Sequence, residues 1–316
     1  MKLAKEALFV ACGLAVLHPW FSSAEALLLG VAFALALGNP FAALTKKWTS
    51  KLLMLSVVLL GFGIDLLVVG RVGLAGVGYT VVTIAFALGM GLLLGRLFGV
   101  SRDLSVLISC GTAICGGSAI AAVSSAIKPR NDDVTMSLAV VFLLNAAALF
   151  IFPSIGHYFG LSPSQFGLWA ALAVHDTSSV LGTAQAFGGE ALQVGTTVKL
   201  ARALWITPLT LAVSFVYARL RSGEGGQGKI TIPWFIFGFI AASAFVTFAP
   251  GMRELGHQVA WIGVRSLVFV LFLIGSNLAR STLARVGARP LAQGLLLWIL
   301  VGSTTLFAIH SGFLTH

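Results

Sequence analysis

Two short stretches inside apolar segments carry the residue types that could do chemistry. The first, residues 111–122, reads GTAICGGSAIAA and has adjacent glycines at positions 116 and 117. Glycine weakens a helix interior by roughly 1 kcal/mol relative to alanine. A broken helix in hydrocarbon leaves backbone N–H and C=O groups unpaired, which is tolerated only where protein buries them or they line a cavity. This stretch therefore predicts a site, with a small-residue helix–helix contact as the alternative.

The second stretch is His175-Asp176-Thr177-Ser178-Ser179, near the middle of another apolar segment. Five consecutive polar residues cannot share one helical face, because neighbouring side chains are about 100° apart. The run therefore predicts either an unwound helix or a helix pressed against a polar cavity. For His175 taken alone, a buried structural histidine is the alternative.

Lys199 and Arg202 follow at a spacing of three residues, which places both on one face of the next apolar segment. Charges inside a membrane segment usually face a cavity or a partner. We expect Asp176, on the preceding segment, to be their counter-charge. The alternative is snorkelling of two long side chains to the nearby segment end.

These groups together predict an anion site. A broken helix offers free N–H groups and the positive end of its dipole, hydroxyls donate hydrogen bonds, and His175 could carry a coupling proton. The residues expected to bind substrate are Cys115, Gly116, Gly117, Ser118, His175, Asp176, Thr177, Ser178, Lys199 and Arg202. Secondary candidates are Asn145, Asn277, Asp65 and Arg265.

Composition restricts the class of protein. Of 316 residues, 58% are hydrophobic and 9% are charged, with a mean hydropathy of +0.99, which is typical of an all-α polytopic membrane protein. The net charge of +10 is spread between apolar runs and does not predict a nucleic-acid site. Cysteines 12, 110 and 115 show no CxxC spacing, and there is no Walker A sequence, so we expect no metal and no cofactor.

Eleven apolar segments are predicted to span the membrane. They cover residues 5–20, 24–44, 51–70, 74–98, 103–127, 132–156, 163–187, 192–220, 231–249, 256–279 and 289–313. An N-terminus in the cytoplasm and a C-terminus outside place thirteen Lys and Arg residues inside and four outside, as the positive-inside rule requires. An odd count favours one extra helix, residues 1–22, followed by two inverted five-helix repeats with broken helices at 23–160 and 161–316. Two weak internal sequence similarities, called echoes here, bear on this duplication. One joins residues 61–66 to 274–278, and the other joins the stretches around Cys115 and His175. The directions of their segments cannot both fit one inverted duplication unless a segment is re-entrant.

Four ordered stretches resemble the YeiH-type sulfate-exporter family of bacterial inner-membrane proteins. They are residues 111–122, 166–176, 198–208 and 232–238. The resemblance covers nearly the whole chain. It implies a relation to the bile-acid symporter and sodium–proton antiporter folds, with crossing broken helices in a core domain that moves as an elevator against a panel domain. After His175-Asp176 the family pattern has an apolar residue and often Gln, where this chain has Thr177-Ser178-Ser179.

The expected function is secondary transport of a small anion, either sulfate or another sulfur-containing or carboxylate anion, across the bacterial inner membrane. Coupling to H⁺ or Na⁺ and a homodimer in the lipid bilayer are part of this hypothesis, and catalytic residues are not. One alternative is a passive anion channel. Another is an intramembrane enzyme that uses Cys115 or Ser118 with His175.

Overall fold

The computed structural model describes residues 2–220, 234–277 and 287–314, and all regular structure in these ranges is helical. Five of the helical stretches are long and apolar enough to cross a membrane by themselves: Gly78–Leu97, Asn131–Tyr158, Gly189–Arg219, Arg253–Ser276 and Ala288–His310. The all-helical membrane class predicted from composition is confirmed for this part of the chain.

The helices follow most of the predicted apolar segments, but the third helix covers residues 42–61 instead of 51–70, and the fourth begins at residue 66 instead of 74. They are α1 (Lys2–Ala15), α2 (Ser23–Ala36), α3 (Ala42–Gly61), α4 (Leu66–Leu97), α5 (Arg102–Ala113), α6 (Gly117–Ile127), α7 (Asn131–Tyr158), α8 (Pro163–Ala173), α9 (Thr177–Phe187), α10 (Gly189–Ala203), α11 (Ile206–Leu220), α12 (Trp234–Phe248), α13 (Arg253–Ser276) and α15 (Ala288–His310). The fifth, seventh and eighth segments are each divided in two. Residues 278–286, within and after the tenth predicted segment, lie outside the described part of the chain.

The fifth segment folds back on itself as a hairpin of α5 and α6. The hydroxyl of Ser101, before α5, donates to Asp133 at the start of α7 over 3.3 Å, so the two ends of the hairpin lie together. Along the hairpin, a Cβ on Gly111 would stand 3.0 Å from the side chain of Ile120, a contact impossible across nine residues of a straight helix. The turn at residues 114–116 is therefore the tip of the hairpin.

The seventh segment forms a second hairpin, of α8 and α9. The rings of Phe166 and Phe187 stack with centroids 3.8 Å apart, and His157 near the end of α7 stacks on Phe187 at 4.3 Å. Its tip is residues 174–176. The structure therefore does not confirm eleven crossing helices or crossing broken helices, because both segments turn back. The eighth segment only kinks between α10 and α11.

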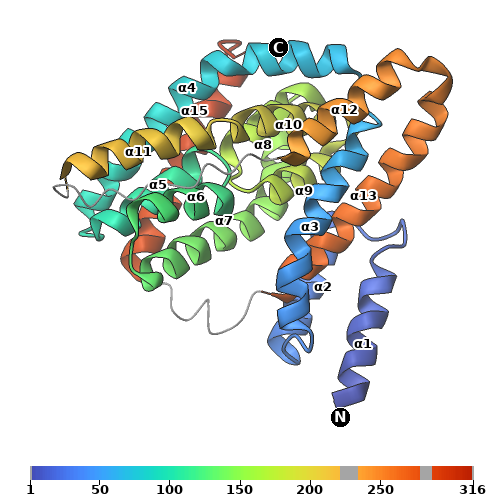
Figure 1. Cartoon of the computed structure of the whole chain (residues 1–316), viewed down its shortest axis with the longest axis horizontal. Coiled ribbons are helices and arrows are strands. Elements are labelled where there is room, and N and C mark those ends of the chain that lie inside the picture. The colour runs from blue at the N-terminus through green and yellow to red at the C-terminus, as the bar shows by residue number, and fades with distance from the viewer. Residues whose placement is uncertain (1, 221–233, 278–286, 315–316) are drawn as a thin grey trace.

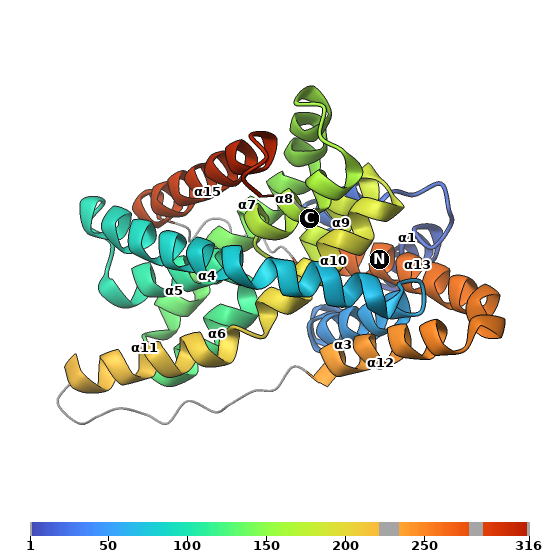
Figure 2. The ribbon, with the colours of Figure 1, turned by 90° about the horizontal axis from the view of Figure 1, so that it is seen from above.

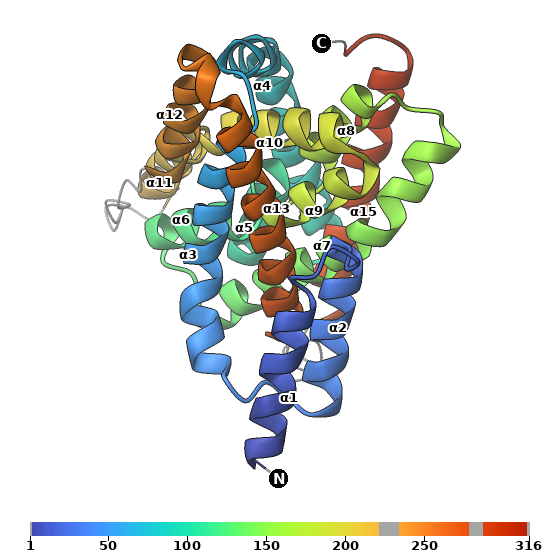
Figure 3. The same ribbon diagram turned by 90° about the vertical axis from the view of Figure 1, so that its right-hand side faces the viewer.

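The helices divide into two groups, which Figure 1 shows on the right and left of the molecule. The first group, called the scaffold, contains α1, α2, α3, α12 and α13. The backbones of its helices touch, because a Cβ on Gly30 of α2 would lie 2.2 Å from the carbonyl oxygen of Phe272, and one on Gly275 of α13 would lie 2.3 Å from that of Leu27. Such small-residue contacts pack helices tightly in lipid. Figure 3 shows α1 beside α2 and α13, with the two ends of the chain at opposite ends of the molecule.

We expect Gly30→Val to destabilise the scaffold by about 2 kcal/mol or more, because the new side chain must displace the α13 backbone. The matched control is Gly78→Val on α4, where nothing lies within 4 Å of the added Cβ. Thermal unfolding of both variants in detergent measures the difference. Equal melting temperatures would contradict the close approach of α2 and α13.

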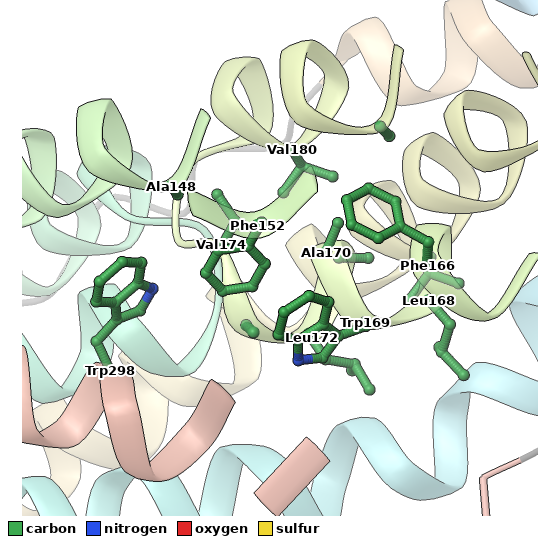
Figure 4. Packing of buried hydrophobic residues seen from close by; sticks show 14 of the residues in the cluster. Ala148, Phe152, Phe166, Leu168, Trp169, Ala170, Leu172, Val174, Val180 and Trp298 are labelled. Atoms are coloured by element: carbon green, nitrogen blue, oxygen red, sulfur yellow. The ribbon is translucent and has the colours of Figure 1, made fainter. Parts of the chain in front are cut away.

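The second group, called the core, contains α4 to α11 and α15. Figure 2 shows α4 running across it, with α15 on one side and α11 on the other. An aromatic cluster fixes the α8–α9 hairpin, since Trp169 stacks on Phe152 with centroids 4.2 Å apart and its indole N–H donates to the carbonyl of Gly302 over 2.9 Å. Figure 4 shows this cluster extending to Trp298 of α15. The hairpin is thus held by rigid packing on α7 and α15.

Candidate functional site

The tip of the first hairpin depends on one glycine. Gly116 has φ +64° and ψ −120°, a backbone conformation that L side chains rarely adopt, and its N–H donates to the carbonyl of Gly111 over 2.8 Å. Cys115 is buried beside it. Gly116 is also the N-cap of α6 and has no side chain to cap the first turn, where the backbone N–H of Ala119 interacts with the Cys115 sulfur. Ser118, in this first turn, is exposed. The start of α6 therefore keeps free donors.

The tip of the second hairpin is capped. Asp176 accepts a hydrogen bond from the backbone N–H of Ser178 over 3.0 Å and another from the Ser178 hydroxyl. Asn145 of α7 accepts from the Asp176 N–H over 3.1 Å. Thr177 is half-buried at the start of α9. An anion at this tip would meet the Asp176 carboxylate, so the two helix starts are not equivalent.

The two tips touch in the interior of the core. A Cβ on Gly116 would stand 3.4 Å from both Cα and Cβ of Asp176. The charges of Asp176, Lys199 and Arg202 all act on Cys115, and those of Lys199 and Arg202 act on His175. The three stretches singled out in the sequence are therefore brought together in space.

Buried polar atoms without a hydrogen-bond partner surround this contact. Both ring nitrogens of His175 are unpaired although the residue is only 1% exposed. The Asn145 amide nitrogen, the Thr112 hydroxyl and the Arg202 Nε are also unpaired. Unpaired buried groups are costly, so these atoms are available to hydrogen-bond to a ligand at the tips. Thr112 was missed in the sequence, although it lies within the glycine-rich stretch and carries the hydroxyl that could have identified it.

Lys199 and Arg202 are fully buried, and snorkelling is excluded. They bind backbone carbonyls. The Lys199 ammonium donates to Val174 over 2.7 Å and to Ala171 over 3.3 Å. Asp176, the expected counter-charge, makes no ion pair with either cation, because it is not within 4.0 Å of them; among the described residues only Arg130 and Asp133 form a pair of that length. Asp176 acts on Lys199 over a longer distance. The C-terminal ends of helices supply carbonyl acceptors, which offset the buried charges instead.

Arg202 joins the two hairpins. Its guanidinium donates to the carbonyl of Leu172 over 2.6 Å and to that of Ala171 over 3.2 Å, both at the end of α8. The other terminal nitrogen donates to the carbonyl of Ala113, the last residue of α5. One side chain thus satisfies acceptors at both tips.

Of the four secondary candidates, one lies at the hairpin tips and three lie away from them. Asn145 lies at the second tip, as described. Arg265 donates four hydrogen bonds to backbone carbonyls at the end of the first apolar segment, and Asp65 caps α4 through the N–H of Leu67. Asn277, which caps the end of α13, accepts from the Thr45 hydroxyl over 2.7 Å. These three hold scaffold helices and connections together and do not lie at the tips.

No hydrogen bond joins His175 to Cys115 or Ser118, the pairing that an intramembrane enzyme would use. A nucleophile and its base must lie within about 2.6–3.2 Å of each other. Neither ring nitrogen of His175 has a partner at all, and Ser118 is exposed whereas His175 is buried.

Comparison with known proteins agrees with this architecture. The family model described as Conserved hypothetical protein 698 matches residues 7–294. A UPF0324 membrane protein of Bdellovibrio bacteriovorus is 54% identical over 313 residues, covering 99% of this chain and 96% of the relative. The chain belongs to the UPF0324 membrane protein family. This membership is consistent with the resemblance to the YeiH-type family.

Alignments with other UPF0324 membrane proteins cover nearly as much of the chain. The relative from Geobacter sulfurreducens is 44% identical over 291 residues, covering 92% of each chain, and that from Vibrio vulnificus is 44% identical over 298 residues, covering 94% of this chain and 96% of the relative. Their names describe membrane proteins and mention no substrate. No solved structure matches the chain.

Proposed function

We propose that this UPF0324 protein is a secondary transporter that moves a small anion across the bacterial inner membrane. The observation that carries the proposal is the meeting of two hairpin tips inside the core, where the uncapped start of α6 adjoins unpaired buried groups. Helix starts attract anions, and the buried cations Lys199 and Arg202 add positive charge around the contact. The anion would lie at the Ser118 side of the tips, away from the Asp176 carboxylate.

With the hairpins taken as re-entrant, the distribution of Lys and Arg agrees better with the predicted orientation. If the fifth and seventh segments are re-entrant, nine segments cross the membrane, with the N-terminus still inside and the C-terminus still outside. Lys128 and Arg130, between α6 and α7, then move to the cytoplasmic side. Only Arg71 and Arg253 remain outside, which strengthens the positive-inside bias.

Re-entrance also reconciles the two internal echoes. Each hairpin is followed by a long helical segment, and the two hairpins open toward opposite sides. The three segments before the first hairpin and the three last segments run in opposite directions as well. We infer an inverted duplication of residues 23–160 and 161–316 in which the hairpin unit comes last in the first half and first in the second.

Alternating access follows from unequal contacts between hairpins and scaffold. Helix α9 packs on α2 and α13, and the Ser23 hydroxyl donates to Gln185 over 2.9 Å. Helix α6 has no comparable contact with the described scaffold helices. Ser118 at the start of α6 is exposed, and a pocket of about 500 Å³ lies at the other end of this helix, beside Ser124 and Lys128. With this end of α6 on the cytoplasmic side, as proposed above, we take the state to be inward-open, and an elevator movement of the core would bring α6 onto the scaffold.

Ligand-dependent thermal stability tests the proposal. Sulfate, sulfite, thiosulfate, taurine and small carboxylates are added to the purified protein at pH 5.5 and 7.5. One of these anions is expected to raise the melting temperature with saturation, because a ligand that binds the folded state stabilises it by mass action. Ser118→Ala and His175→Ala are expected to lose the response.

The matched control is Ser154→Ala, since this exposed hydroxyl on α7 bonds only to the carbonyl of Phe150. It should respond as the wild type does. If no anion shifts the wild type, or if Ser118→Ala responds normally, the anion site is misplaced. A passive channel, the second candidate, would show flux in liposomes without saturation or exchange. Coupling to H⁺ or Na⁺ and a homodimer remain part of the proposal.

A further inference from the structure

The C-terminal ends of the helices at the hairpin tips create a local need for positive charge. The last carbonyls of a helix have no intrahelical partner, and the end of the helix carries a partial negative charge. In transporters with discontinuous helices, such carbonyl ends commonly coordinate a free cation such as Na⁺. The end of α8, buried at the centre of the core, is a position of this kind.

A side-chain cation fills this position. Lys199 is fully buried, and its ammonium lies 2.7 Å from the carbonyl oxygen of Val174 and 3.3 Å from that of Ala171. The Asp176 carboxylate is beyond 4.0 Å but still acts electrostatically on Lys199. The ammonium therefore takes its ligands from the helix end, as a free monovalent cation would.

We infer that the Lys199 ammonium is a tethered cation that occupies a monovalent-cation site formed by the carbonyls of Ala171 and Val174. Free sodium is then not needed to assemble the tips. Removing the ammonium opens the site to a small cation from solution, with Asp176 still nearby to attract it. The inference also predicts that transport does not need sodium, and this part rests on the proposed function. The cation site itself does not depend on that function.

Thermal unfolding in different chloride salts tests the site without any transported anion. Wild type and Lys199→Ala are compared in NaCl, KCl, NH₄Cl and choline chloride at equal concentration, so that chloride and ionic strength cancel. The wild type is expected to melt at the same temperature in all four. Lys199→Ala is expected to melt lower in choline and to regain at least about 2 °C, with saturation, in a salt of a small cation.

Two further variants separate this effect from general destabilisation. Thr197→Val lies on the same buried helix and loses a hydroxyl bonded only to the carbonyl of Gln193, so it should show no cation-specific gain. Lys199→Gln keeps most of the side-chain volume and is used if the alanine variant does not fold. It is expected to show the same cation-dependent gain.

Sodium-specific stabilisation of the wild type would overturn the inference. So would identical melting of the folded Lys199 variant in all four salts. The cation experiment and the anion titration are independent, because each uses its own ligand. A failure of the cation site is therefore distinguishable from a failure of the proposed anion site.

Discussion

Replacing Gly116 by valine is expected to abolish anion transport while the rest of the protein folds. The residue has φ +64° and ψ −120°, and a Cβ there would lie 3.1 Å from the Val141 side chain and 3.4 Å from Asp176. A non-glycine residue in such a conformation costs on the order of 1–3 kcal/mol. The tip must shift to relieve this strain, and the shift separates it from the second tip. Uptake into liposomes measures the loss.

Gly89→Val is the matched control for that experiment. Gly89 is exposed within α4, and nothing lies within 4 Å of its added Cβ. We expect this variant to keep most of the transport activity. Transport by Gly116→Val at the wild-type rate would show that the contact between the tips has no part in the cycle.

The second large effect is expected from Arg202→Ala, on folding rather than on substrate affinity. The guanidinium satisfies the carbonyls of Ala113, Ala171 and Leu172 in a fully buried position. Each buried acceptor left unpaired costs about 1–3 kcal/mol, so the variant should lose most of its stability. Size-exclusion chromatography and thermal unfolding in detergent measure the yield of folded protein.

Arg219→Ala is the control, because this arginine is exposed and lies over the Phe215 ring at 4.2 Å. Its effect on stability should be small. Arg202→Lys is expected to give an intermediate result, since an ammonium cannot reach both hairpins as a guanidinium fork can. A stable Arg202→Ala protein with weakened anion binding would instead indicate that Arg202 contacts the substrate.

Both expectations follow from the way in which the hairpins are joined. Arg202 bonds to the end of α5 and the end of α8, and Gly116 brings the start of α6 against Asp176. Breaking either connection separates two elements that are distant in sequence. The hairpins and α10 are therefore joined to one another, which is what the proposed movement of the core against the scaffold requires.

The sequence alone determined the membrane class, the apolar segments and the stretches that meet at the site. Hydrophobicity and helix-weakening residues act locally. The pair Gly116-Gly117 and the polar run at His175 therefore predicted the interruptions of their helices, although the distant contacts were unknown. Membership of the UPF0324 family agrees with the membrane class. Asn145 was singled out because an amide in an apolar helix is costly wherever it packs, and it lies at the second tip, where it accepts from the Asp176 N–H.

Only the tertiary structure decided what happens at the interruptions. A break in a helix does not say whether the chain continues across the membrane or turns back, because that depends on contacts such as those of Ser101 with Asp133 and of Phe166 with Phe187. The partners of Lys199 and Arg202 were likewise set by packing. The sequence offered Asp176 as the nearest opposite charge, but the ends of α5 and α8 place backbone carbonyls closer, and a buried cation bonds to the acceptors within its reach.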